Sequence, residues 1–214
     1  MKKLLFILLT VSAISMELIA QDIILPAPDK TGGKPLMQTL NERQTTRSFT
    51  TDSLTLQQLS DLFWAAFGIN RTDQGKRTAP SAMNWQEIDM YVTMPRGTYV
   101  YDAAAHALKF INNKDLRSET GSQDFVAGAA LNIVYVADMG KRGIKEADTI
   151  KDSDLFMSYS DAAFIAQNIY LYCASANLGC VVRGSVPDNN LASDLGLRPD
   201  QRIILAQTAG VPKK

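Results

Sequence analysis

One segment, residues 153–177, constrains the fold of this chain more than any other part of the sequence. It predicts a long helix, and its apolar residues lie on almost every side of that helix. A helix that is apolar all round has to be buried against more than one surface. We therefore expect a helix packed on several sides, in a position that is typical of a subunit interface.

The pattern in the rest of the chain predicts an α+β fold. Thr55 and Gln58 form a capping-box pattern at the start of an amphipathic helix, and Gly68 marks its end. Residues 88–94 alternate apolar and polar, which predicts a half-buried strand, whereas the polar segment 69–79 predicts a loop. Further helices are expected at 35–43, 123–127 and 188–194, and further strands at 99–101, 107–111, 131–136 and 202–208.

Composition limits both the domain count and the partners. The chain has 214 residues, 46% hydrophobic and 21% charged, which is typical of one globular domain with a sizeable core. The formal net charge is zero, so the field of the whole molecule gives no reason to expect nucleic acid or an anionic membrane as a partner. Any anion has to be bound by a local group of side chains.

The first twenty residues have the pattern of a secretory signal. Lys2 and Lys3 precede a short apolar run at 4–14, and Ala20 is the expected cleavage point. The run is shorter than the roughly 20 apolar residues of a bilayer-spanning helix, and no lipobox cysteine follows it. We expect a periplasmic or secreted protein without a stable membrane anchor after cleavage. The mature chain would have an irregular lead at 21–34 and one domain at 35–214.

The sequence holds two cysteines and one histidine. Along a continuous helix, Cys173 and Cys180 would lie about 10 Å apart, too far for a disulfide. Buried free thiols are therefore the expectation, and a bridge stays open only if Gly179 ends the helix first. His106 has no nearby Cys or carboxylate partner in the sequence, so we expect it to be structural and expect no metal site.

Two polar blocks carry the functional signal. In the block at 43–47, Arg43 and Arg47 offer a phosphate two guanidinium groups. In the block at 80–86, Asn84 and Gln86 offer amides that can bind the edge of a heterocycle. Separately, the arginines could be a solvated helix face and the amides could cap a loop. Together, at this interval, they indicate a flavin site.

The order of these blocks along the chain resembles the nitroreductase-like FMN-dependent flavoenzyme family. Gly97 to Asp102 and the His106 to Leu108 stretch most resemble the subgroup that includes azoline-forming peptide-maturation dehydrogenases. The resemblance implies a nitroreductase-like α+β fold with a central, mostly antiparallel sheet flanked by helices. It also implies a homodimer with the long helix at its interface. The matching segments are 43–49, 80–86, 97–102, 106–108, 162–179, 195–197 and 209–212.

The same resemblance implies a set of FMN-binding residues. One part holds the phosphate and pyrimidine end, a second contacts the ring, a third brings backbone close to flavin N5, and a terminal lysine closes the phosphate pocket. Arg183 could instead be a plain surface arginine or a substrate contact, and Lys213 a terminal residue without a role. The family often has Pro-Trp after the glutamine, whereas Glu87 and Ile88 follow here. The implied phosphate and pyrimidine contacts are Arg43, Gln44, Thr45 and Arg47. The implied ring contacts are Asn84 and Gln86. The backbone near flavin N5 is that of Val182, Arg183 and Gly184, and the terminal lysine is Lys213.

The implied activity is ping-pong transfer of electrons or hydride through flavin N5 to a small nitroaromatic, quinone or related acceptor. No catalytic side chain is assigned, because the cofactor carries the reaction. Most of the resembled family uses NAD(P)H as electron donor, which is not expected outside the cytoplasm. Two alternatives therefore stay open: a flavin-dependent dehydrogenase that oxidises a heterocycle or peptide, and a non-catalytic member of the fold that binds a ligand.

Overall fold

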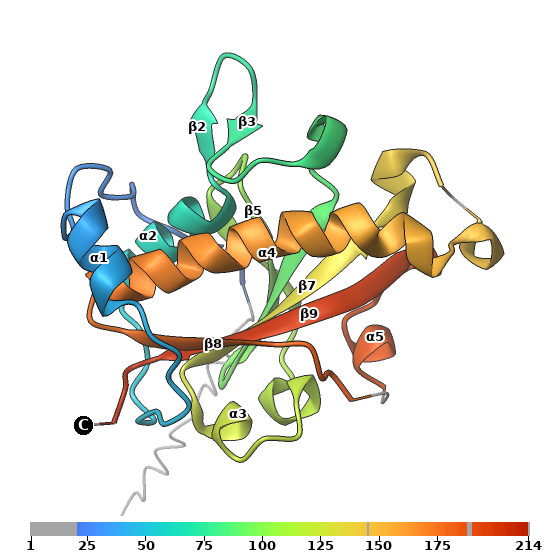
Figure 1. Ribbon diagram of the computed structural model, residues 1–214. Coiled ribbons are helices and arrows are strands. Elements are labelled where there is room, and N and C mark those ends of the chain that lie inside the picture. Colours follow the sequence, from blue (N-terminus) through green and yellow to red (C-terminus); the bar gives the residue numbers. More distant parts are fainter. Residues whose placement is uncertain (1–20, 145, 188–189, 214) are drawn as a thin grey trace, which may run out of the picture.

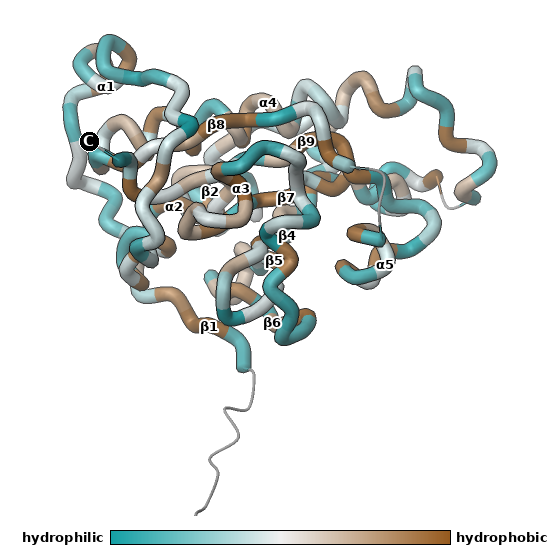
Figure 2. Tube along the Cα trace, turned by 90° about the horizontal axis from the view of Figure 1, so that it is seen from below, coloured by the Kyte–Doolittle hydropathy of each residue, from teal (hydrophilic) through white to brown (hydrophobic). Residues whose placement is uncertain are grey.

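The computed structural model describes residues 21–144, 146–187 and 190–213, so the predicted signal segment lies outside the described residues. Its centre is a seven-stranded sheet in which every neighbouring pair is antiparallel. The strand order is β1-β6-β5-β4-β7-β9-β8, and Figure 2 shows β1 and β6 at the opposite edge from β8. The strands are β1 (Ile23–Ile24), β4 (Ile88–Met94), β5 (Gly97–Asp102), β6 (Ala107–Asn112), β7 (Leu131–Asp138), β8 (Gly179–Arg183) and β9 (Gln201–Gly210).

Helices cover both faces of this sheet (Figure 1). One face packs against two long helices, α2 and α4, in the main hydrophobic core, and α1 contacts the C-terminal part of α4. The other face packs against the short helices α3 and α5 in two smaller clusters. The α+β architecture with a central antiparallel sheet is confirmed. The helices are α1 (Leu36–Glu42), α2 (Leu56–Phe67), α3 (Phe125–Gly128), α4 (Asp152–Ser175) and α5 (Leu191–Asp194).

Coverage of both faces explains one wrong expectation. The alternation in 88–94 predicts a half-buried strand, yet six of the seven residues of β4 are buried. Tyr91, which would face solvent in a half-buried strand, packs instead in the cluster that contains Leu191 of α5. Tyr91 is thus accommodated within a second, smaller core.

The local signals for helix ends hold. The Thr55 hydroxyl accepts the Gln58 backbone N–H at 3.1 Å, and the Gln58 side chain accepts the Thr55 N–H at 2.9 Å, so α2 begins with a capping box. Helix α2 ends at Gly68, and α1 ends at Arg43, as predicted. This places the first arginine block at the junction of a helix and a loop.

Four short strands, β1, β2, β3 and β8, were not predicted. The polar segment 69–79 contains a small hairpin of β2 (Ile69–Arg71) and β3 (Lys76–Arg77), and the lead contains β1. Strand β8 follows α4 directly after a turn.

Cys173 and Cys180 are free and buried, as expected. Among the described residues, no helix is both long enough and apolar enough to cross a bilayer.

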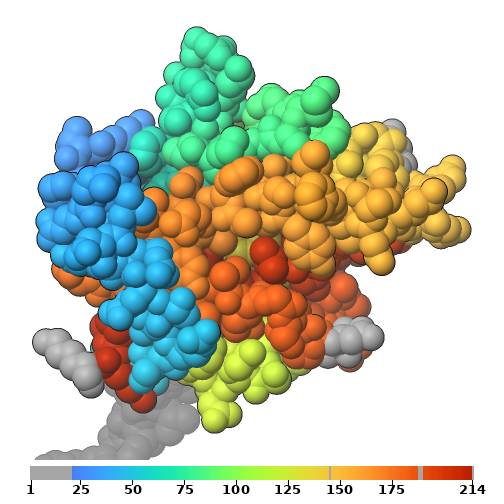
Figure 3. Space-filling view, in the orientation of Figure 1, coloured from blue at the N-terminus to red at the C-terminus, as the bar shows by residue number. Residues whose placement is uncertain are grey.

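Helix α4 is only partly enclosed. Its buried residues face the sheet and α2, but four large apolar side chains remain 44–66% exposed, and they lie in its N-terminal and central parts. Figure 3 shows α4, in orange, running across an open face of the molecule. Within one chain, therefore, the predicted burial on several sides is incomplete. The exposed side chains are Phe156, Met157, Tyr159 and Phe164.

Candidate functional site

The first arginine block runs beside the start of β8. The Thr46 backbone N–H donates to the Cys180 carbonyl at 3.0 Å. A Cβ on Gly179 would lie only 2.7 Å from the Thr46 side chain, so this close approach requires a glycine. Two segments that are far apart in the sequence, and that the resemblance assigns to one cofactor site, are thus neighbours in the fold.

Tyr170 of α4 joins these two segments. Its hydroxyl accepts the Val182 N–H at 3.0 Å and lies 3.3 Å from the Thr45 hydroxyl. The Arg43 guanidinium lies over the Tyr170 ring, 5.3 Å from its centroid, in cation–π contact. Sequence reasoning missed this residue, because nothing distinguishes Tyr170 from the other aromatic residues of a largely apolar helix. Gln44, between these residues, is exposed.

The C-terminus reaches the same region. The Lys213 backbone N–H donates to the Ser48 carbonyl at 3.0 Å, and Phe49 forms a bridge with Pro212. Arg47 and Lys213 line one open cavity of about 630 Å³, whose wall also includes Asp124. Within the described part of the chain, Arg43, Arg47 and Lys213 form no ion pair with a carboxylate. These cations are therefore free to bind an external anion.

The structure corrects both interpretations of the Arg183 side chain. The guanidinium is neither exposed nor available to a substrate, since the residue is only 5% exposed. It donates to the Thr120 carbonyl and, at 3.3 Å, to the Asn132 side chain. Burial lowers the pKa of Arg183 to about 10. Sequence reasoning missed this burial, because arginine is usually exposed.

Only the backbone of 182–184 therefore remains as a candidate cofactor contact. Gly184 is exposed, and a Cβ built on it would meet no atom within 4 Å. The open space beside Gly184 leaves this backbone accessible, so its assignment stays a prediction.

The amide block has an unusual backbone. Met83, Asn84 and Gln86 adopt positive φ angles of 51°, 56° and 49°. Such angles are uncommon for residues other than glycine and persist only where the surroundings hold them. The Ala82 N–H donates to the Asp161 carboxylate at 2.8 Å, and the Gln86 N–H donates to the Ser81 hydroxyl at 2.9 Å. We call residues 81–86 the amide loop.

A buried carboxyl group, that of Glu87, is hydrogen-bonded to the amide loop. Glu87 is fully buried, and its carboxyl oxygens accept the Ser158 hydroxyl at 2.9 Å and the Ser81 hydroxyl at 3.3 Å. Burial raises the pKa of Glu87, and the nearby Asp161 carboxylate acts in the same direction. Glu87 thus connects the amide loop to α4 through two serine hydroxyls.

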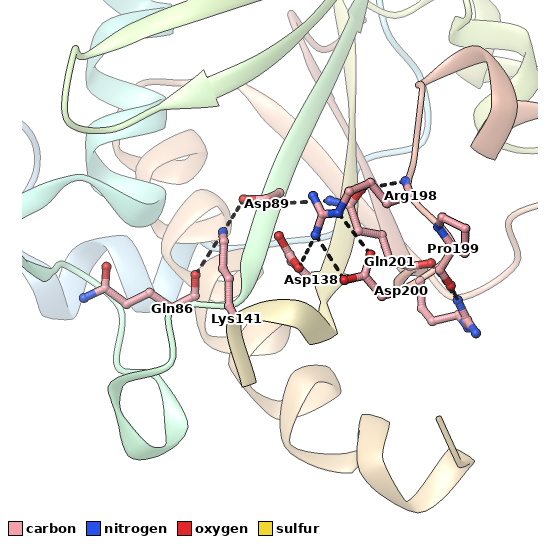
Figure 4. Close-up of polar contacts among 9 residues, drawn as sticks. Gln86, Asp89, Asp138, Lys141, Arg198, Pro199, Asp200 and Gln201 are labelled. Atoms are coloured by element: carbon pink, nitrogen blue, oxygen red, sulfur yellow. Dashed lines mark hydrogen bonds and ion pairs between the residues drawn. The ribbon is translucent and has the colours of Figure 1, made fainter. Parts of the chain in front are cut away.

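A second connection runs from the amide loop to the sheet (Figure 4). The Lys141 ammonium donates to the Asp89 carboxylate at 2.6 Å and to the Gln86 carbonyl at 3.4 Å. Burial raises the pKa of Asp89, and Lys141 acts against that shift. The same figure shows Arg198 ion-paired with Asp138, which packs this end of the sheet.

The amide side chains are already oriented by the protein. The Arg77 guanidinium donates to the Gln86 side-chain oxygen at 2.7 Å, so the Gln86 amide nitrogen points to the Asn84 oxygen at 3.2 Å and to the Gly75 carbonyl at 3.1 Å. Among the described residues, the Asn84 side-chain nitrogen makes no hydrogen bond. Asn84, which is exposed, therefore offers a free donor next to a fixed glutamine.

Within one chain the two blocks do not meet. The amide loop is anchored on α4 at Asp161, whereas Arg43 and Thr45 contact α4 at Tyr170. These two positions are nine residues apart, which places them roughly 13 Å apart along the helix and about half a turn around it. The predicted site is therefore split between opposite sides of α4.

His106 has a structural role, as predicted. Its ring nitrogens lie 2.7 Å from the Ser60 hydroxyl and 3.1 Å from the Tyr101 hydroxyl. Burial lowers the pKa of His106. These contacts fix the loop between β5 and β6 against α2, well inside the fold.

Comparisons with known proteins agree with this arrangement. The family model described as Nitroreductase family matches residues 40–211. A candidate nitroreductase of Ralstonia eutropha JMP134, known from a crystal structure, is 45% identical, with a TM-score of 0.83 over 91% of this chain and 90% of that one. A candidate nitroreductase of Methanocaldococcus jannaschii is 25% identical over 76% of this chain and 85% of that protein.

A more distant structure shares the fold. It is a candidate nitroreductase of Desulfovibrio desulfuricans in complex with FMN, 19% identical, with a TM-score of 0.58 over 86% of this chain and 89% of that one. Because the family model covers most of the described sequence, this chain belongs to the Nitroreductase family.

Proposed function

We propose that this protein is an FMN-dependent oxidoreductase that passes electrons from a donor to a small-molecule acceptor. Membership of the Nitroreductase family supports this assignment, as does the FMN complex of the Desulfovibrio relative. The observation that carries it is that the arginine block meets β8 at Tyr170, while the residues that follow the block, Ser48 and Phe49, contact the C-terminal segment. That convergence brings together segments that a flavin mononucleotide would need at once.

The residues present fit an FMN phosphate. A phosphate dianion needs cations that are not already neutralised, and Arg43, Arg47 and Lys213 meet that requirement. The Thr45 hydroxyl supplies a further hydrogen-bonding group beside Arg43. Bound FMN would supply two-electron chemistry at N5. The exposed backbone at Gly184 would present an N–H donor near that position, so no titrating side chain is required.

The split site supports a homodimer. Asn84 and Gln86 lie on the opposite side of α4 from the arginine block, so one chain cannot bring both to one cofactor by the contacts it makes. A second copy packed on α4 would supply its own amide loop to the first copy's arginine block. The exposed Phe156 and Phe164 of α4 and the 83% exposed Met83 in the amide loop supply apolar surface for this contact.

The direction of electron flow has two candidates. A reductase would accept electrons from a nicotinamide and reduce a nitroaromatic or quinone. A dehydrogenase would oxidise a heterocycle or peptide, in line with the resemblance of residues 97–102 to that subgroup. The signal pattern of residues 1–20 points to export, where NAD(P)H is not expected, and this favours testing both directions. A non-catalytic binder is the remaining alternative.

The test begins with the visible spectrum of the protein without its first twenty residues. Bound oxidised flavin absorbs at about 450 nm. Anaerobic addition of NADH, then NADPH, then dithionite separates the candidates: bleaching by a nicotinamide supports the reductase, and bleaching by dithionite alone supports another donor or the dehydrogenase. A protein that is colourless and does not take up added FMN would overturn the proposal. Sedimentation analysis of the same sample tests the dimer.

A further inference from the structure

A small cavity adjoins the amide loop, and the charged side chains that line it are all cationic. Its volume is about 240 Å³, and it lies between the β2–β3 hairpin and the amide loop. Three cationic side chains, Arg71, Lys76 and Arg77, face Asn84 and Gln86 across it. No Asp or Glu is among the described residues that line it. We call it the cationic cavity.

Among the described residues, the cations of the cationic cavity are not paired with a carboxylate. Arg71 donates to the Asn70 side chain at 3.1 Å and to the Arg77 carbonyl at 2.7 Å, which are both neutral acceptors. Arg77 donates to Gln86 at 2.7 Å and to the Phe67 carbonyl at 3.2 Å, again neutral. In the part of the chain that the structure describes, none of the three cations forms a salt bridge.

Hydrogen bonds hold two of these cations, Arg71 and Arg77, in place. The Arg71 guanidinium spans the hairpin to the Arg77 carbonyl, and the Thr78 N–H donates to the Gly68 carbonyl at 2.9 Å. Arg77 is half-buried over the Phe67 ring, and desolvation lowers its pKa, with Asp89 and Asp102 acting in the opposite direction. A partly desolvated cation next to two more cations interacts strongly with an anion, because a concave wall of low dielectric focuses the field. Since the whole chain is neutral, this is a local property of the cavity.

We propose that the cationic cavity binds an anionic group, a carboxylate or a phosphate, on the small-molecule reactant. This inference rests on the proposed function, because the cavity shares Asn84 and Gln86 with the predicted flavin contact. The reactant that exchanges electrons with the flavin would then lie with its anionic end between Arg71 and Lys76. Either reactant of a ping-pong pair could carry that group, so both the acceptor and the donor are tested.

The acceptor test compares 4-nitrobenzoate with 4-nitrobenzamide, which have the same shape and differ in charge. The expected kcat/KM for the anion exceeds that for the amide about tenfold at low ionic strength and falls toward it in high salt. Lys76→Gln and Arg71→Gln should each lower this ratio several-fold. The Lys76 side chain makes no hydrogen bond or ion pair within the described residues, so its variant should fold even if the loss of the Arg71 hydrogen bonds disturbs the hairpin.

The donor test compares NADPH with NADH, which lacks the additional phosphate, in the anaerobic bleaching of the flavin. A preference for NADPH that Lys76→Gln removes would place the anionic group on the donor. Arg96→Gln is the matched control, because Arg96 is an exposed cation in the turn between β4 and β5, and its variant should leave both preferences unchanged.

The two proposals fail in different ways. If the flavin is bound and turns over, but neither pair shows a charge preference that depends on Arg71 or Lys76, the anion site is wrong and the oxidoreductase stands. If the protein neither carries flavin nor takes up added FMN, the proposed function itself is wrong.

Discussion

The hydroxyl of Tyr170, in α4, accepts a hydrogen bond from the backbone N–H of Val182, in β8, at 3.0 Å. Strand β8 is at the edge of the sheet, and at this point its outer side faces the long helix rather than another strand. The same hydroxyl lies 3.3 Å from Thr45. One phenol therefore sets the distance between the arginine block and the backbone that the proposed flavin would approach.

Removing that hydroxyl should weaken FMN binding. In Tyr170→Phe the ring under Arg43 remains, but the half-buried Val182 N–H loses its partner, at a cost of about 0.5–1.5 kcal/mol in stability. We expect a clear rise in the FMN dissociation constant, measured by flavin fluorescence. Tyr172→Phe is the matched control on the same helix, because the Tyr172 hydroxyl makes no hydrogen bond within the described residues. Equal FMN affinity in the two variants would contradict the role of Tyr170.

The phosphate assignment predicts a loss of affinity in Arg43→Ala. A charge-assisted hydrogen bond to phosphate contributes about 1.5–3 kcal/mol, which corresponds to a rise of roughly tenfold or more in the dissociation constant. Arg43→Lys should retain part of this energy, since it keeps the charge and loses the fork geometry. Calorimetric titration of the apoprotein with FMN measures both. If Arg43→Ala binds FMN as tightly as Arg96→Ala does, Arg43 has no such contact.

Substitutions of two buried serines can distinguish an effect on the position of the amide loop from an effect on the stability of the whole fold. Ser158 and Ser60 are both fully buried and hydrogen-bonded, Ser158 to Glu87 and Ser60 to the Pro26 carbonyl and His106. Replacing either by alanine should cost about 1–3 kcal/mol, because a buried polar group loses its partner. Only Ser158→Ala should also shift the visible flavin spectrum and the FMN affinity. The same flavin change in both variants would mean that the effect is one of stability alone.

Glu87 predicts a pH dependence of a definite sign. Burial raises its pKa in the native state, so between the unfolded and native pKa values the folded chain holds a proton that the unfolded chain has released. The contribution of Glu87 to stability is therefore greatest at low pH and falls as pH rises through that interval. Glu87→Gln cannot titrate. We expect the stability of the variant relative to wild type to rise as pH increases above the ordinary glutamate pKa of about 4, in urea unfolding. A constant difference across that range would show that Glu87 does not titrate in it.

Much of the fold could be predicted because its signals are local. The capping box at Thr55, the breaks at Arg43 and Gly68 and the long apolar segment of α4 each act within a few residues. The burial of β4 on both faces could not be predicted, since it depends on α5 packing beneath the sheet. The hairpin at 69–77 is too short and too polar to have a periodicity of its own.

The candidate site, like the fold, could be predicted only in part. The residue types of the two blocks indicate what they can bind. Arg47 and Lys213 line one cavity and Arg43 lies over Tyr170, but their role in binding FMN stays a prediction. Tyr170 and the burial of Arg183 follow only from tertiary packing, which no spacing in the sequence encodes. The separation of the blocks across α4 likewise requires the structure.

Because the Arg183 guanidinium is held in place, a methyl group added at Gly121 would clash with it. A Cβ on Gly121 would lie 1.9 Å from an Arg183 guanidinium nitrogen, whereas a Cβ on Gly128 would meet no atom within 4 Å. The guanidinium cannot easily move away, because Thr120 and Asn132 hold it. The backbone of Gly121 is extended at φ 175°, so the expected cost of Gly121→Ala comes from this clash and not from backbone strain.

Gly121→Ala should therefore lower the free energy of unfolding by about 1–3 kcal/mol, the usual cost of overpacking. Gly128→Ala, at the end of α3, should be neutral or slightly stabilising, since alanine is the better helix former. Combining Gly121→Ala with Arg183→Met removes the clashing nitrogen, so the double variant should lose less stability than the sum of the two single variants. Urea unfolding of the four proteins measures the coupling. Strict additivity would show that the methyl group and the guanidinium do not meet, and that Arg183 is held less tightly than its hydrogen bonds indicate.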